Sequence, residues 1–114
     1  MVRWDVHVIV DLPAVRPARL AERVAVDELM EHVRDFRELL RGARRERLDD
    51  GVRLSLHLDV RTIARLADLV RAEADVFPFW SFRLLAAPPE CVLEIGGEGR
   101  AGELARAVFG DLAR

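Results

Sequence analysis

The sequence predicts an α+β fold, a two-layer sandwich in which helices cover one face of a mixed or largely antiparallel four-stranded sheet. Three observations predict it. Two segments alternate apolar and polar residues, three segments repeat apolar residues at helical spacing, and two short apolar runs flank a proline-rich turn. In chain order the elements are β-α-β-α-β-β-α. We expect one domain spanning residues 1–114, because a chain of this length supports a single hydrophobic core.

The strands are predicted from alternation of residue type. In residues 3–11, valines alternate with aspartate and histidine, and in residues 52–58 apolar residues alternate strictly with polar ones after an Asp-Gly turn. A third strand around residues 82–84 and a fourth at residues 91–95 form a hairpin across a Pro-Pro pair. The first two strands therefore each have one apolar face for the core and one polar face.

The first helix is predicted to start near Pro17 and to end at Gly42. Its apolar stripe begins only at Val26, so we allow a kink or a fresh start capped by Asp27. The arginine-rich segment 41–47 is interpreted as a charged helix end followed by a loop, because cations are favourable at the C-terminus of a helix.

The second helix follows Asp59, whose carboxylate suits a helix N-terminus, and ends before Pro78. A third helix begins near residue 101. The glycine-rich segment 96–102 lacks the Lys-Ser/Thr ending of a phosphate-binding P-loop, and we interpret it as the turn that leads from the last strand into this helix.

Four of the seven aromatic residues occur in the run from Val76 to Phe82. We expect the core to close there, because each buried ring removes roughly 150–250 Å² from water. The four side chains cannot all point the same way on a helix-to-strand turn. We therefore also expect one or two of the rings to be partly exposed and to contact a ligand or a partner. The aromatic residues are Phe77, Phe79, Trp80 and Phe82.

Charge and composition argue against several classes of function. A net charge of −2, with acidic residues among the arginines of segment 41–47, argues against nucleic-acid binding. No apolar run reaches the ~18–20 residues of a membrane span, and the N-terminus lacks the apolar core of a signal peptide, so we expect a cytoplasmic protein without membrane contact. All 18 basic residues are arginine, and lysine is absent, a bias typical of a GC-rich bacterial genome. The single Cys91 alternates into a strand, and we expect a buried, inert thiol.

If the valines and leucines of the first two strands face the helices, their polar side chains emerge together on the other face of the sheet. Two histidines flanked by carboxylates on neighbouring strands are typical of general acid–base chemistry, because imidazole titrates near neutrality and needs an orienting partner. The candidate catalytic residues are His57, His7, Asp5 and Asp59. Their spacing fits no metal-binding motif, so we expect no metal ion and no cofactor.

Two further interpretations of this face remain open. In the first, the polar face of these strands is simply the solvated side of an antiparallel sheet. In the second, it is a mixed polar and apolar surface that forms a homodimer interface. We also expect a small apolar or aromatic molecule to bind between this face and the aromatic run. The candidate ligand-binding residues are Arg83, Phe79, Trp80 and Ser55.

The stretch from Glu73 to Leu84 has the sequence EADVFPFWSFRL and precedes a hairpin, a glycine-rich entry and a last helix with Val108-Phe109 near its end. This order resembles a group of small, largely uncharacterised bacterial α+β proteins whose helix ends in E-x-x-C-C-P-F, followed by F-x-L. In this chain Val76 and Phe77 replace the cysteine pair. The resemblance therefore implies the fold alone, and a thiol-metal or redox role does not transfer.

The sequence thus predicts a small cytoplasmic ligand-binding or accessory protein of bacterial small-molecule metabolism that forms a homodimer. One alternative is a small cofactor-free enzyme in which His57 or His7 is the acid or base, an aspartate orients it, and Arg83 binds an anionic or carbonyl group. Another alternative is an interaction module, such as an immunity or regulatory partner, with the aromatic run as its contact surface. The sequence does not decide whether the protein is an enzyme.

Overall fold

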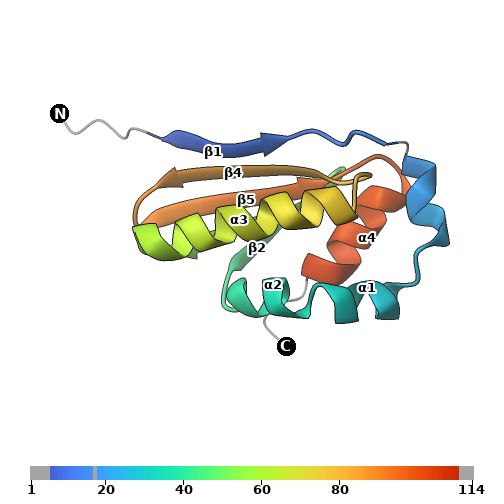
Figure 1. Cartoon of the computed structure of the whole chain (residues 1–114), viewed down its shortest axis with the longest axis horizontal. Helices are drawn as coiled ribbons and strands as arrows, with labels where there is room; N and C mark the ends of the chain where they lie inside the picture. The colour runs from blue at the N-terminus through green and yellow to red at the C-terminus, as the bar shows by residue number, and fades with distance from the viewer. Residues whose placement is uncertain (1–5, 17, 111–114) are drawn as a thin grey trace.

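The computed structural model describes residues 6–16 and 18–110 and contains one five-stranded sheet (Figure 1). The strands are β1 (His7–Leu12), β2 (Arg44–Leu48), β3 (Gly51–His57), β4 (Ser81–Ala87) and β5 (Glu90–Gly96). The helices are a 3₁₀ helix η1 (Ala18–Arg23), and α1 (Val26–His32), α2 (Arg34–Leu39), α3 (Val60–Val76) and α4 (Arg100–Phe109). The α+β class predicted from the sequence is confirmed, but the prediction of four strands is wrong by one.

The strand order is β1-β4-β5-β3-β2, and every neighbouring pair is antiparallel. Strands β3 and β4 are joined by α3 and leave room for β5 between them, which is a split β-α-β arrangement. The predicted hairpin across the Pro-Pro pair is present as β4 and β5. The central strand β5 is therefore paired on both sides, and β1 and β2 form the edges.

The additional strand is β2, the segment that the sequence analysis interpreted as a helix end and loop. Its alternate residues Arg45 and Arg47 lie opposite the buried Leu54 and Val52, on the helix side of the sheet. They are arginines because β2 is an edge strand whose inner side meets the end of a helix. Arg45 donates a hydrogen bond to the carbonyl of Gly110, at 2.7 Å, just after α4. The inward side chains of β2 are polar, so its sequence lacks the alternation of apolar and polar residues by which a strand is usually predicted.

The helices lie on one face of the sheet (Figure 1), where α3 packs on β1 and β4, and α4 packs on β3 and β5. The predicted first helix is divided into η1, α1 and α2. The fresh start that the sequence analysis allowed is found at Val26, and a further break occurs at Val33. Ala25, and not Asp27, occupies the N-cap position of α1, so that capping prediction is wrong. The apolar stripe itself is confirmed, since Leu29, Val33 and Phe36 are all about 1% exposed.

The core is closed by the aromatic run between α3 and β4. Trp80 is 1% exposed, and its indole N–H donates a hydrogen bond of 2.8 Å to the carbonyl of Ala101 in α4. Its ring lies 5.3 Å from Phe77 and 5.4 Å from both Phe79 and Phe109. Phe77, Phe79 and Phe82 are also buried, so the expectation that one or two rings are partly exposed is wrong. The rings turn toward α4, which covers this corner of the sheet.

The glycine-rich segment connects β5 to α4, as the sequence predicts. Gly99 is the N-cap of α4 with a φ of 54°, a conformation that side chains disfavour. The next glycine in the helix, Gly102, lies against the β2–β3 turn, where an added Cβ would come within 2.7 Å of the carbonyl oxygen of Asp50. Gly99 therefore allows a positive φ and Gly102 allows close approach of two backbone segments, and neither glycine needs a phosphate to explain it.

We predict that replacing Trp80 by alanine lowers the free energy of unfolding by roughly 3–5 kcal/mol, because the change leaves a cavity and removes the hydrogen bond to the carbonyl of Ala101. Chemical denaturation monitored by circular dichroism measures the change. The matched control is Val76→Ala, at a neighbouring side chain that is 51% exposed, which we expect to cost less than about 1 kcal/mol. Equal effects of the two substitutions would show that Trp80 does not anchor the core.

Candidate functional site

The structure does not bring His7 and His57 together. His7 lies on β1 and His57 on β3, and β4 and β5 separate these strands. Three strand spacings correspond to about 14 Å between them. The two histidines therefore do not form the acid–base pair that the sequence suggested.

The register of β1 also places the two histidines on opposite faces. His7 pairs with the buried Ala86, which faces the helices, whereas His57 pairs with Glu90 on the other face. A β-bulge between Val8 and Val10 causes this, because one extra residue moves every side chain before it to the opposite face. A bulge does not disturb the alternation of residue types, so the sequence did not reveal it.

The two aspartates proposed to orient these histidines are not placed to do so. Asp5 lies outside the described residues. Asp59 is the N-cap of α3, and its Oδ1 accepts a hydrogen bond of 2.7 Å from the backbone N–H of Thr62. Hydrogen bonds from Thr62 also hold the pKa of Asp59 below its ordinary value. The carboxylate near His57 is instead Glu90, whose Oε1 lies 3.9 Å from the Nε2 of His57.

The predicted ligand residues are also distributed over two ends of the sheet. Trp80 precedes Ser81 at the start of β4, whereas His57 lies level with Glu90 and Ala87 at the end of β4. Six residue steps along a strand are about 20 Å. Phe79 borders a hollow of about 290 Å³ at the Trp80 end but is only 4% exposed. This hollow shares no lining residue with the cavity that adjoins His57.

A cavity lies at the opposite end of the sheet, beside His57. It has a volume of about 610 Å³, and we call it the β3 cleft. It lies where β2 begins, since Arg44 pairs with Ser55 and the chain before Arg44 leaves the edge of β3. The lining residues are Leu39, Arg41, Gly42, Arg44, Ser55, Leu56, His57, Leu58, Glu90, Cys91 and Val92.

Backbone groups of His57 face this cleft. The N–H of Leu58 donates a hydrogen bond of 2.8 Å to Pro89, toward β5. Successive residues of a strand direct their N–H and C=O groups to opposite sides, so those of His57 point to the β2 side. Because β2 begins at Arg44, opposite Ser55, it leaves the N–H and C=O of His57 without a strand partner. The cleft thus offers one backbone donor and one backbone acceptor.

The side chains of the β3 cleft combine positive charge with an apolar floor. Arg44 is exposed and makes no ion pair with a described residue, whereas Arg41 pairs with Glu38 at 3.1 Å. The hydroxyl of Ser55 and the imidazole of His57 lie between these cations and the carboxylate of Glu90. Cys91 belongs to the floor, and burial raises the pKa of its thiol to about 11, which keeps it protonated at neutral pH. The expectation of a buried thiol is confirmed.

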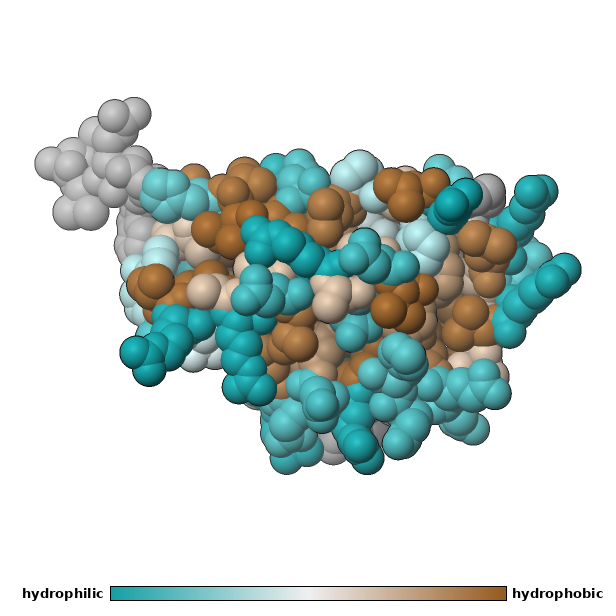
Figure 2. All heavy atoms as spheres, in the orientation of Figure 1, coloured by the Kyte–Doolittle hydropathy of each residue, from teal (hydrophilic) through white to brown (hydrophobic). Residues whose placement is uncertain are grey.

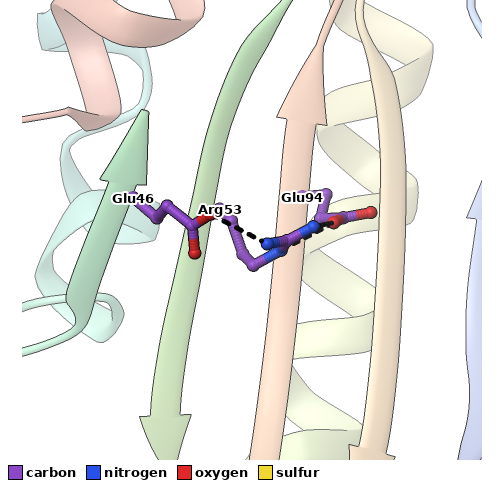
Figure 3. Close-up of polar contacts among 3 residues, drawn as sticks. All are labelled: Glu46, Arg53 and Glu94. Carbon is purple, nitrogen blue, oxygen red and sulfur yellow. Dashed lines mark hydrogen bonds and ion pairs between the residues drawn. The ribbon is translucent and has the colours of Figure 1, made fainter. Parts of the chain in front are cut away.

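Away from the cleft, the open face of the sheet carries a row of charges that alternate in sign. The row runs from β1 to β2 as Asp11, Arg83, Glu94, Arg53 and Glu46, each paired in register with the next. Figure 3 shows Arg53 between its two partners. Its guanidinium contacts the Oε2 of Glu94 at 2.8 Å and that of Glu46 at 3.1 Å. The predicted site residue Arg83 belongs to this charged row and not to the cleft.

One carboxylate that the sequence analysis did not select is unusual. The Oε2 of Glu73, on α3, is buried and has no hydrogen-bond partner among the described groups. Burial raises the pKa of Glu73 above its ordinary value, and the nearby His32 on α1 lowers it by a smaller amount. Glu73 lines neither the β3 cleft nor the hollow beside Phe79, so we treat it as a titrating group of the helical layer.

We predict that Glu73→Gln makes the protein more stable at neutral pH. The pKa of Glu73 in the folded chain lies above the ordinary 4.5, so the folded state holds a proton that the unfolded state releases. Wild-type stability therefore falls as pH rises from 4.5 through the folded-state pKa, and a neutral amide at this position removes that loss. Urea unfolding between about pH 4 and about pH 8 measures the difference.

The exposed Glu22 provides the matched control, as Glu22→Gln. We expect the stabilising effect of Glu73→Gln to be absent at the acid end of the range and to grow toward neutral pH, with little change for the control. A variant less stable than the wild type by the same amount at every pH would contradict the assignment.

Metal-binding clusters and membrane-spanning helices are absent from the described part of the chain. It contains no group of three or more His, Cys, Asp or Glu side chains arranged to hold a metal ion. None of the helices within residues 6–16 and 18–110 is long and apolar enough to cross a membrane. Comparison with known proteins gives no match to a family model, to a curated protein or to a solved structure.

Proposed function

We propose that the protein binds a small molecule with an apolar or aromatic body and an anionic group in the β3 cleft. The observation that supports this most directly is the combination of Arg44 and the open backbone of His57 with an apolar floor. A guanidinium binds a carboxylate or phosphate through paired hydrogen bonds. The cleft volume of about 610 Å³ lies within the usual range for small-molecule sites, about 300–1,000 Å³.

Each part of the cleft has a separate task in this proposal. Arg44, assisted by Arg41, attracts the anionic group, and His57 offers its backbone N–H and C=O to polar atoms next to it. Leu39 and Leu58 contact the apolar body. Of the ligand-binding residues expected from the sequence, Ser55 lines the cleft and remains a proposed ligand contact, whereas Phe79 and Trp80 are buried in the core. We place this accessory protein in the cytoplasm of a bacterium, on the basis of its single buried cysteine and its composition.

An enzymatic role for His57 remains the alternative proposal. It now relies on Glu90 as the orienting carboxylate, at 3.9 Å from the imidazole. That distance is longer than a hydrogen bond, and the side chain of His57 is 77% exposed. Binding without turnover is therefore the better supported of the two roles.

We predict that benzoate, as a probe, binds the β3 cleft with a dissociation constant on the order of 1 mM, as expected for a ligand of this size. Titration followed by ¹H–¹⁵N NMR should shift the amide signals of Ser55, His57 and Leu58. Benzamide, the neutral analogue, should bind at least about threefold more weakly, because it lacks the charge that Arg44 recognises.

Arg44→Gln should weaken benzoate binding on the order of fivefold, whereas Arg65→Gln, on the exposed surface of α3, should leave it unchanged. Benzoate binding that is equal in both variants, or signal shifts confined to residues near Trp80, would refute the assignment of the site.

A further inference from the structure

We infer that the open face of the sheet is a homodimer interface, on which a second copy of this chain packs its own sheet about a twofold axis lying along the strands between β4 and β5. The inference does not depend on the proposed ligand. It follows from the arrangement of two rows of side chains on that face.

The open face is uncovered in the single chain. The helices contact the opposite face, and the described residues include no element that packs over the charged row. Beside that row lies a second row, which runs from β1 to β5 as Val8, Leu85 and Val92 and which we call the apolar row. Val8 is 56% exposed, and Leu85 and Val92 are partly exposed. Figure 2 views the molecule from the side of α3 and α4, and the open face lies on the side turned away from the viewer.

The charged row is complementary to itself under the proposed axis. A twofold rotation between β4 and β5 exchanges β4 with β5 and β1 with β3. It therefore sets Arg83 against Glu94 of the second copy, and Asp11 against Arg53 of the second copy. Neither Arg83 nor Asp11 forms an ion pair with a described residue of its own chain, although each lies in register with an opposite charge. Both charges are thus available to a partner.

The same axis also matches the apolar row. It sets Leu85 against Val92 of the second copy, at the centre of the interface. An axis between β5 and β3 would still oppose unlike charges, but it would set Leu85 against Arg44. An axis along the middle of β5 would set Arg83 against Arg53, which repel. An axis between β1 and β4 would oppose Asp11 to Arg83 and Val8 to Leu85, but only two strands of each copy would overlap. The axis between β4 and β5 satisfies both rows with four overlapping strands, and this complementarity selects the second copy as the occupant.

The size of the face sets the expected affinity. Four overlapping strands about 4.8 Å apart and about 20 Å long give a footprint of roughly 400 Å² on each copy. This is at the low end for specific interfaces, so we expect a dimer that dissociates at micromolar concentrations. Sheets that pack face to face cross at about 30°, so the match is best for Arg83, Glu94, Leu85 and Val92, which lie next to the axis.

Sedimentation equilibrium of the full chain, with circular dichroism as a check on folding, tests the interface by charge reversal. Arg83→Glu and Glu94→Arg should each weaken the dimer on the order of tenfold or more, since each places like charges together twice across the twofold axis. Mixing the two variants should restore the affinity to within about threefold of the wild type, because each reversed charge then meets its opposite. Arg65→Glu, on the exposed surface of α3, is the control and should have no effect.

Restoration on mixing depends only on contacts between copies, so it cannot result from changes of charge within one chain. A wild-type chain that remains monomeric up to about 0.5 mM would overturn the inference. So would a dimer that is indifferent to both reversals, or one that mixing does not restore. Ile9→Pro disturbs β1, which is an edge strand. A dimer that is lost in this variant but not in the charge reversals would pair through the free edge of β1, and this result would also overturn the inference.

Discussion

The pairing of β2 with β3 forms the β3 cleft and adds the last charge to the row on the open face. Where β2 lies beside β3, it brings Glu46 next to Arg53 and completes the charged row on the open face. Where β2 begins, at Arg44, it leaves the last residues of β3 without a neighbour and so forms the β3 cleft. If β2 began two residues earlier, the backbone of His57 would be paired and the cleft would be filled.

Carbonyl groups, and not apolar contacts, hold β2 in this position. Arg45 donates to Gly110, and Arg106 donates from α4 to the carbonyl of Asp49 in the β2–β3 turn, at 3.0 Å. Arg37 donates to Val108 from the side of α2, at 2.8 Å. Two of these arginines satisfy backbone acceptors at the end of α4, where a positive charge also interacts favourably with the helix dipole. Arg45, which looks like part of a solvated helix end in the sequence, is thus an attachment of an edge strand.

The sequence predicted those parts of the fold that depend on burial. The α3 helix, its cap at Asp59 and the β4–β5 hairpin follow from apolar spacing and a known capping preference, and the structure contains each of them. The aromatic run was correctly expected to close the core, but its expected exposure was not found, because the sequence does not show that α4 covers it. The strand β2 was missed because its inward residues, Arg45 and Arg47, are arginines, and Arg45 bonds to a carbonyl group instead of packing in the core.

The candidate site was harder to predict, because it depends on strand order and register. Alternation placed His57 on the polar face correctly, but it also placed His7 there, and the bulge in β1 reverses that assignment. The order β1-β4-β5-β3 places two strands between the histidines, and nothing in the local sequence specifies that order. Arg83 and Ser55 were selected for a common site, yet they lie in different rows of the open face.

Backbone amide hydrogen exchange along β3 tests the central claim most directly. The amides of Arg53 and Ser55 face β2, and those of Leu54, Leu56 and Leu58 face β5, so we expect all five to exchange slowly. The amide of His57 should exchange at least about 100-fold faster than these, because β2 does not reach it. Protection of His57 equal to that of Leu56, or exchange of Arg53 and Ser55 as fast as that of His57, would contradict both the fifth strand and the cleft that it forms.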